Sequence, residues 1–285
     1  MAAIDVAHLK TWVGRTAEAR DIVTPRLIDG FRVTLGPHLA PVDAGEAPLA
    51  LHWCLAPTLT PIGEVGPDGH AARGGFLPPV PLPRRMWAGG SIETLGPLRS
   101  GDSVTRLSRI ADLSLKDGRS GALCFVNVTY EFATARGVAI RERHDIVYRD
   151  VPSGNAAPAG KPAPASAAPA RGETVWEIEA DPVLLFRYSA LTFNGHRIHY
   201  DYPYVTGVEG YAGLVVHGPL QASLLFNLAA TLGGRAPRRF DYRGVAVLIA
   251  GQRFQVHGRR DGENGAQCWT QDASGTVNMQ ASATW

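Results

Sequence analysis

The run LTFNGHRIHYD, residues 191–201, places several groups capable of proton transfer and hydrogen bonding close together in the sequence. It contains Asn194, His196, Arg197, His199 and Asp201 directly after an apolar stretch. Imidazole has an ordinary pKa of about 6.5, so it takes and gives a proton at neutral pH. A single histidine is often only structural, but the density of polar groups in this run favours catalysis.

A second group of candidates is the sequence His217-Gly218-Pro219, which reads as the start of a helix. The first amides of a helix have no acceptor within it and lie at the positive end of its dipole, so they stabilise negative charge on an oxygen. Proline has no amide hydrogen, which leaves Gly218 and Leu220 as candidate donors. An ordinary helix start explains the same residues, and the sequence alone leaves both interpretations open.

The elements that hold these residues follow from hydrophobic spacing. Residues 24–36 and 181–194 each predict a helix, because a capping Thr or Asp precedes a proline and apolar residues at helical spacing. Residues 217–234 predict a longer, apolar and therefore central helix that ends at two glycines. Residues 121–132 alternate apolar and polar side chains after Asp117-Gly118, which predicts a turn and a strand; residues 242–258 and the C-terminal segments predict further strands.

The chain divides into two similar halves. Residues 152–173 contain Ala, Pro or Gly at 16 of 22 positions and no bulky apolar residue, which is typical of a semi-extended linker. Residues 1–151 and 174–285 each read as a helix followed by antiparallel strands, so we predict two domains of the α+β class from an internal duplication. The prolines within residues 74–90 exclude a long central helix from the first half, which we interpret as degenerate.

Composition narrows the class of protein. A net charge of +2 without a basic cluster argues against a nucleic-acid partner. The longest apolar runs are far shorter than the roughly 20 residues of a membrane span, and the N-terminus does not read as a secretory signal, so we expect a cytoplasmic protein. Three widely spaced cysteines show no metal-ligand pattern. We expect no metal and no organic cofactor; a homodimer is compatible with the sequence.

Residues 191–225 resemble the MaoC-like, R-specific enoyl-CoA hydratase and dehydratase group of hot-dog-fold enzymes. That group's motif contains an Asp, an Asn-Pro pair and a His, followed by His-Gly at the start of the central helix. The runs FRYSALTFNGHRIHYD and RGGFLPPVPLPRRMWAGG are similar to a two-hot-dog subfamily that includes itaconyl-CoA and mesaconyl-C4-CoA (3-methylfumaryl-CoA) hydratases. The resemblance covers nearly the whole chain apart from the linker. It implies a double hot-dog fold and a hydro-lyase.

The family pattern assigns roles to individual residues and also shows departures. His199 falls on the family histidine, and the resemblance implies that it is the general acid and base. The resemblance also implies that the Gly218 amide donates a hydrogen bond to the thioester carbonyl. Asn194 occupies the position of the family aspartate, and an amide orients water but does not accept its proton at neutral pH. His199 therefore acts alone, or Asp201 or His196 supplies the missing base. The first half has no matching histidine, so one active site per chain is expected.

The expected substrate is an α,β-unsaturated acyl-CoA thioester, and two arginines suggest a dicarboxylic one. Arg187 and Arg197 flank the catalytic run, and a guanidinium matches a carboxylate well, although either residue is equally explained by solvent or by the phosphates of CoA. His196 and His217 are further candidates for substrate binding. We predict hydration of itaconyl-CoA or mesaconyl-C4-CoA to citramalyl-CoA. The alternatives are an acyl-carrier-protein dehydratase of fatty-acid synthesis, a non-catalytic acyl-CoA-binding protein and, with less support, a thioesterase.

Overall fold

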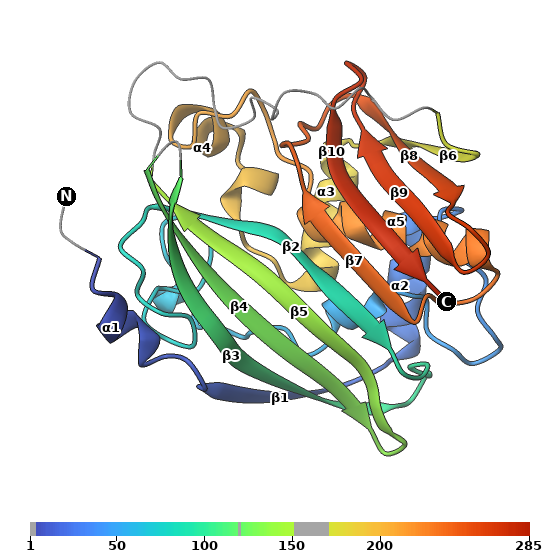
Figure 1. The fold of residues 1–285 in the computed structure, drawn as a ribbon, viewed down its shortest axis with the longest axis horizontal. Coiled ribbons are helices and arrows are strands. Elements are labelled where there is room, and N and C mark those ends of the chain that lie inside the picture. Colours follow the sequence, from blue (N-terminus) through green and yellow to red (C-terminus); the bar gives the residue numbers. More distant parts are fainter. Residues whose placement is uncertain (1–3, 119–120, 151–170) are drawn as a thin grey trace.

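The computed structural model describes residues 4–118, 121–150 and 171–285, and its main feature is one ten-stranded antiparallel sheet. The strand order is β1-β3-β4-β5-β2-β7-β10-β9-β8-β6. The strands are β1 (Thr16–Ile22), β2 (Arg84–Thr94), β3 (Ser103–Gly118), β4 (Gly121–Thr134), β5 (Gly137–Arg149), β6 (Thr174–Glu179), β7 (Arg239–Gly244), β8 (Arg253–Arg260), β9 (Gly265–Gln271) and β10 (Val277–Thr284). Figure 1 shows this sheet with helices lying behind it.

The first half of the chain supplies β1 to β5 and the second half supplies β6 to β10. The two groups of strands meet at β2 and β7, which pair from Gly89↔Arg243 to Glu93↔Arg239. The two predicted sheets are therefore joined edge to edge. Most of the predicted linker, residues 152–173, lies outside the described residues.

The helices are α1 (Val6–Lys10), α2 (Pro25–Leu35), α3 (Pro182–Thr192), α4 (Tyr202–Gly207) and α5 (Gly218–Gly233), with short 3-10 helices η1 (Leu51–Cys54), η2 (Ile62–Glu64) and η3 (Arg197–His199). The predicted capping of α2 and α3 is confirmed. The Thr24 side chain accepts a hydrogen bond from the Leu27 amide, and Asp181 accepts one from Leu184. Each cap satisfies an amide that the helix itself leaves free.

Helix α5 is the predicted central helix, and its bounds agree with the sequence. Eleven of its residues are buried, and it packs on β8, β9 and β10. The next residue, Gly234, has a φ of 69°, a conformation that favours glycine and ends the helix. The largest apolar core contains side chains from α2, α5 and strands of both halves, so the sheet and its helices enclose one continuous core.

No counterpart of α5 exists among the described residues of the first half, as its prolines predicted. Instead, Val80 and Leu82 of this segment are buried against the inner face of β3, β4 and β5. The guanidinium of Arg73 donates hydrogen bonds to the carbonyls of Val80, Leu82 and Pro83. These bonds hold the proline-rich segment in place, because its prolines prevent it from forming the hydrogen bonds of a helix.

Two predicted elements differ from the structure. Residues 242–258 do not form one strand, because β7 ends at Gly244 and β8 begins at Arg253. The apolar residues between them instead bond to the segment before α5: the Val216 amide donates to Leu248, and the Ala250 amide donates to Leu214. The predicted turn at Asp117-Gly118 is also misplaced, since β3 continues through Gly118.

No helix in the described part of the chain is long and apolar enough to cross a membrane.

Candidate active site

His199 and His217 stack on each other at the start of α5. Their ring centroids are 3.6 Å apart and their planes differ by 17°. His199 ends the short helix η3, and His217 directly precedes Gly218, the first residue of α5. The Val215 amide donates to the carbonyl of Ile198 over 3.0 Å, which joins the two segments and sets their spacing. The structure thus brings together the two groups that the sequence selected separately.

The hydrogen bonds of His199 fix which nitrogen is basic. Its Nδ1 lies 2.7 Å from the carbonyl oxygen of Val215. A carbonyl only accepts, so Nδ1 carries the hydrogen and Nε2 of the neutral ring keeps its lone pair. Burial lowers the pKa of His199 to about 4. Nε2 has no hydrogen bond to any residue that the structure describes, so His199 is a neutral base with a free lone pair at pH 7.

His217 is completely buried, and its environment also keeps it neutral. Its Nε2 lies 2.8 Å from the hydroxyl of Ser189, on α3. Its Nδ1 is buried without a partner in the described ranges. Burial is the main reason that its pKa lies well below the ordinary value, and the charges of His199 and His196 act in the same direction. A buried polar atom without a partner is costly, so Nδ1 of His217 is a candidate contact for a ligand.

Gly218 occupies a position that only glycine fits. A Cβ atom there would lie 2.5 Å from the Trp87 ring, on β2. Neither the Gly218 amide nor the Leu220 amide has an acceptor among the described residues. The free amides are at the positive end of a sixteen-residue helix, which is the arrangement that stabilises an oxyanion.

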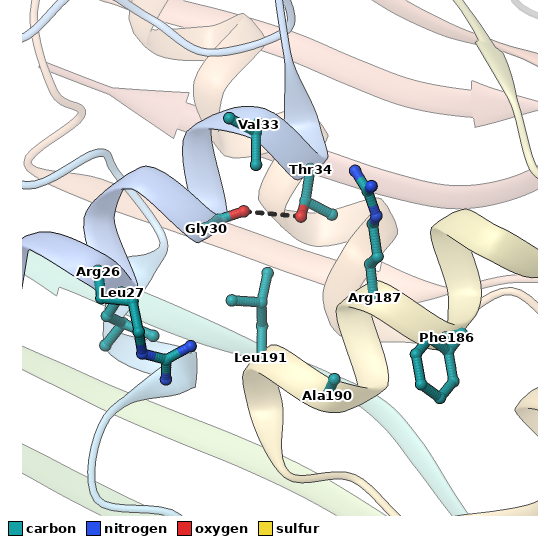
Figure 2. A pocket seen from close by; sticks show the side chains of 9 residues that line it. All are labelled: Arg26, Leu27, Gly30, Val33, Thr34, Phe186, Arg187, Ala190 and Leu191. Atoms are coloured by element: carbon teal, nitrogen blue, oxygen red, sulfur yellow. Dashed lines mark hydrogen bonds between the residues drawn. The ribbon is translucent and has the colours of Figure 1, made fainter.

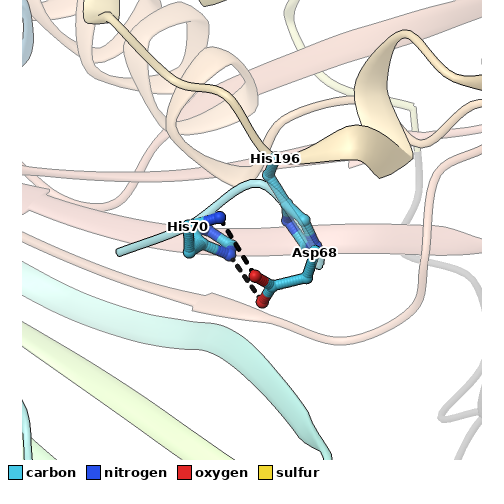
Figure 3. A group of neighbouring side chains, drawn as sticks. All are labelled: Asp68, His70 and His196. Atoms are coloured by element: carbon cyan, nitrogen blue, oxygen red, sulfur yellow. Dashed lines mark hydrogen bonds and ion pairs between the residues drawn. The ribbon is translucent and has the colours of Figure 1, made fainter. Parts of the chain in front are cut away.

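A loop of the first half reaches the same site. Asp68 accepts hydrogen bonds from the backbone amide and Nδ1 of His70, both at 3.0 Å. The His70 ring lies 4.1 Å from that of His196, whose ring in turn stands edge-on to His199 at 5.4 Å. Figure 3 shows His70 and His196 side by side with the Asp68 carboxylate bonded to His70. The side chains therefore form a row that crosses from the first half to the start of α5.

Burial controls the charge of this row. Burial is the main reason that the pKa of His196 falls to about 2, and it also lowers the pKa of His70. The hydrogen bond and charge of His70 outweigh burial at Asp68 and hold the pKa of its carboxyl well below the ordinary range. At neutral pH the row consists of one carboxylate and neutral imidazoles, which suits proton transfer.

A close approach of two backbones holds the first-half loop in place. Gly69 has a φ of +89°, and a Cβ atom there would lie 1.9 Å from the carbonyl oxygen of Gly195. The Arg197 amide donates to the carbonyl of Asp68 over 2.9 Å, and the Arg197 guanidinium donates to Pro67 over 3.0 Å. Any side chain at residue 69 would separate the loop that carries His70 from the loop that carries His196.

The other residues of the run have mainly structural contacts. The Asn194 side chain accepts the His196 amide and shapes the turn before it. Asp201 caps α4 by accepting the Tyr204 amide, and its carboxylate pairs with Arg197 at 2.8 Å. The carboxylate of Asp201 is thus occupied by partners other than His199.

Arg187 lies apart from the histidines. It is exposed on α3 and borders a surface groove between α2 and α3. Figure 2 shows its side chain beside Thr34 in this groove. The two arginines suggested for the substrate carboxylate thus have different surroundings: the guanidinium of Arg197 is paired with Asp201, and that of Arg187 lies in the groove.

Sequence reasoning missed Asp68 and His70. It predicted one active site per chain because the first half has no histidine in the family register, and the structure adds that His70 of this half packs on His196 of the second half. The only signal was a polar Asp-Gly-His sequence among prolines and glycines. Nothing in its spacing linked it to residues some 130 positions later.

Asp68, His70 and His196 also form a donor set that a cation is able to use, because their ligand atoms lie within 4.8 Å of one another. The positive charge of Arg85, however, disfavours protonation of both His70 and His196. The hydrogen bond between Asp68 and His70 and the neutral imidazoles also fit an acid–base group.

Comparisons with known proteins agree with this chemistry. Residues 50–250 match the family model of hydroxyacyl-thioester dehydratase type 2. Mesaconyl-C(4)-CoA hydratase of Chloroflexus aurantiacus is 41% identical over 258 residues, which are 90% of this chain and 91% of that protein. The mitochondrial hydroxyacyl-thioester dehydratase type 2 of Schizosaccharomyces pombe is 32% identical over 84 residues, 28% of each chain.

Solved structures confirm the α+β double hot-dog fold. HtdX of Mycobacterium tuberculosis has a TM-score of 0.67 and 16% identity, covering 94% of this chain and 98% of its own. A MaoC-like dehydratase of Phytophthora capsici has a TM-score of 0.65 and 18% identity, covering 99% and 98%. Another M. tuberculosis protein, described as a double hot-dog, has a TM-score of 0.55 and 13% identity, covering 95% and 96%.

Proposed function

Because the chain belongs to the hydroxyacyl-thioester dehydratase type 2 family of MaoC-like hydro-lyases, we propose that it hydrates the double bond of a dicarboxylic enoyl-CoA, with mesaconyl-C4-CoA as its substrate. The substrate is suggested by the 41% identity with a mesaconyl-C(4)-CoA hydratase over most of both chains. Itaconyl-CoA is the second candidate thioester. The homodimer and the cytoplasmic location expected from the sequence stay predictions.

One observation supports the reaction most strongly: the neutral His199, with its Nε2 free, lies beside the unpaired first amides of α5. Hydration needs a base for water at the β-carbon and a donor for the thioester oxygen, where negative charge develops. His199 and the Gly218 amide offer these two functions from neighbouring segments. The stacked His217 fixes the plane of the His199 ring.

The proposed steps follow from these positions. Nε2 of His199 takes a proton from water as the water oxygen bonds to the β-carbon. The electrons of the double bond move toward the thioester oxygen, which accepts a hydrogen bond from the Gly218 amide. The protonated His199 then delivers its proton to the α-carbon. Because burial disfavours the protonated ring, its proton is released readily.

The Asp68–His70 pair offers the proton acceptor that the Asn194 amide lacks. With Nδ1 of His70 bonded to Asp68, the other ring nitrogen of neutral His70 is an acceptor. The His70 ring packs on that of His196, which in turn stands edge-on to His199. We assign to the pair the orientation of the attacking water, a role that the family pattern gives to a carboxylate at residue 194.

A panel of thioesters tests the proposal. Purified protein is given mesaconyl-C4-CoA, itaconyl-CoA, crotonyl-CoA and a 3-hydroxyacyl group on acyl-carrier protein, and kcat/KM is measured for each. We expect the highest value for mesaconyl-C4-CoA. A preference for crotonyl-CoA would remove the dicarboxylic assignment, and a preference for the carrier-bound substrate would establish the dehydratase of fatty-acid synthesis instead.

A further inference from the structure

We propose that Arg85, on β2 of the first half, binds the free carboxylate of the substrate. This inference rests on the proposed dicarboxylic substrate and assigns its recognition to a residue outside the catalytic run. It replaces the two arginines that the sequence suggested, since Arg197 is paired with Asp201 and Arg187 lies in the surface groove beside α2.

The strand places Arg85 at a suitable distance from the reacting group. Side chains alternate along a strand, so Arg85 and Trp87 lie on the same face of β2, whereas Arg84 points to the other face and pairs with Glu209. Trp87 packs against Gly218, whose amide is the proposed donor to the thioester. Two residues along a strand span about 7 Å between Cα atoms, so Arg85 lies one side-chain position from Trp87 on the face that contacts Gly218.

The guanidinium of Arg85 has no hydrogen bond or ion pair with an acidic side chain within residues 4–116, 121–150 and 171–285. Asp68, the carboxylate whose pKa responds to the charge of Arg85, is itself bonded to His70. A half-buried cation without a counter-ion is a natural site for an anionic ligand.

Neighbouring polar groups also lack acceptors. Tyr148 is directly opposite Arg85 on β5, and its buried hydroxyl interacts with the Arg85 guanidinium but has no acceptor among the described residues. The ring nitrogen of Trp87 is likewise unpartnered. A carboxylate bound to Arg85 gives the Tyr148 hydroxyl an acceptor, which removes the cost of an unsatisfied buried group.

The electrostatics link Arg85 to the catalytic row. Its positive charge contributes to the lowered pKa values of Asp68, His70 and His196, so these groups lie within its field. Burial raises the pKa of Tyr148, and Arg85 opposes that shift. A substrate that extends from Gly218 to Arg85 therefore passes the row of side chains that prepares the water.

The test uses the full chain and two substrates of similar length. The variants Arg85→Gln and Arg85→Lys are compared with the wild type and with Arg253→Gln, which changes an exposed arginine on β8. Both mesaconyl-C4-CoA and the uncharged crotonyl-CoA are assayed by the loss of their conjugated ultraviolet absorbance. Thermal unfolding is recorded for each protein.

We expect Arg85→Gln to lower kcat/KM for mesaconyl-C4-CoA about 100-fold, as removal of one member of a desolvated charge pair does. Its loss on crotonyl-CoA should be clearly smaller, because that substrate has no charged end and only the weaker effect of Arg85 on the row of Asp68, His70 and His196 is removed. Arg85→Lys keeps the charge but not the planar fork, so its loss should be smaller and again confined to the dicarboxylic substrate. If Arg85→Gln does not fold, the Arg85→Lys variant tests whether Arg85 binds the substrate carboxylate.

Failure of the inference is distinguishable from failure of the proposed function. Equal losses on both substrates, or no loss on either, in a protein that hydrates mesaconyl-C4-CoA well would overturn the role of Arg85 alone. A wild type that hydrates crotonyl-CoA but not mesaconyl-C4-CoA would overturn the proposed substrate and, with it, the need for a carboxylate site.

Discussion

The contact between Gly69 and Gly195 provides a direct way to separate the first half from the active site. Changing Gly69→Ala places a Cβ atom 1.9 Å from the Gly195 carbonyl oxygen, while contacts below 3.0 Å are not tolerated. The two loops must therefore move apart by about 1 Å or more. A displacement of about 1 Å at a reacting group lowers catalysis on the order of 100-fold.

Gly45→Ala is a matched control for the backbone strain. Gly45 has a φ of +83°, close to the +89° of Gly69, but a Cβ atom there meets nothing within 4 Å. Both variants pay the cost of an alanine in a left-handed conformation, about 1 to 2 kcal/mol. Only Gly69→Ala also disturbs the bonds from Arg197 to Asp68 and Pro67.

The assay is kcat/KM on the preferred enoyl-CoA, together with the melting temperature of each variant. We expect both variants to melt a few degrees lower, and Gly69→Ala alone to lose activity by about 100-fold. If Gly69→Ala folds and turns over substrate as well as Gly45→Ala does, the first-half loop does not take part in catalysis, and the role of Asp68 and His70 is wrong.

The remaining predictions concern pH. Because burial lowers the pKa of His199 to about 4, its basic form persists at neutral and weakly acidic pH. As the pH is lowered, kcat/KM should therefore decrease with an apparent pKa nearer 4 than 6.5. A decrease centred near 6.5 would contradict the buried, neutral ring. The unfolded chain, with an ordinary histidine pKa of about 6.5, takes up the proton first as pH falls, so His199 alone should make the protein about 2 kcal/mol less stable at pH 5 than at pH 7. Urea unfolding at the two pH values measures this change, and equal stabilities would show that the histidines are not buried as described.

Local sequence signals were sufficient for most helices. The caps of α2 and α3 and the two glycines that end α5 act within a few residues, so their pattern can be read from the chain alone. The same holds for β4, whose Cys124, Val126 and Val128 alternate into the core. The family resemblance implies that His199 and Gly218 act on the same thioester, but it does not predict the stacking of His199 on His217.

Long-range contacts account for what the sequence did not predict. The segment between β7 and β8 is apolar because Val247 and Ile249 pack against the small core that contains Val215, and its pattern does not differ from that of a buried strand. Asp68 and His70 reach the site through contacts such as the bond from Arg197 to Pro67, which joins residues 130 positions apart. The place of Arg85 near the site depends on the pairing of β2 with β5 and on the contact of Trp87 with Gly218, which no local pattern of the sequence indicates.

The central claim is that Nε2 of His199 is the base that activates water. His199→Asn tests it most directly, because an asparagine amide is able to replace Nδ1 as donor to the Val215 carbonyl but has no basic nitrogen. With the protein folded and saturated with its preferred enoyl-CoA, the rate of hydration should fall by about two to four orders of magnitude. A folded His199→Asn variant with near-normal turnover would contradict the assignment.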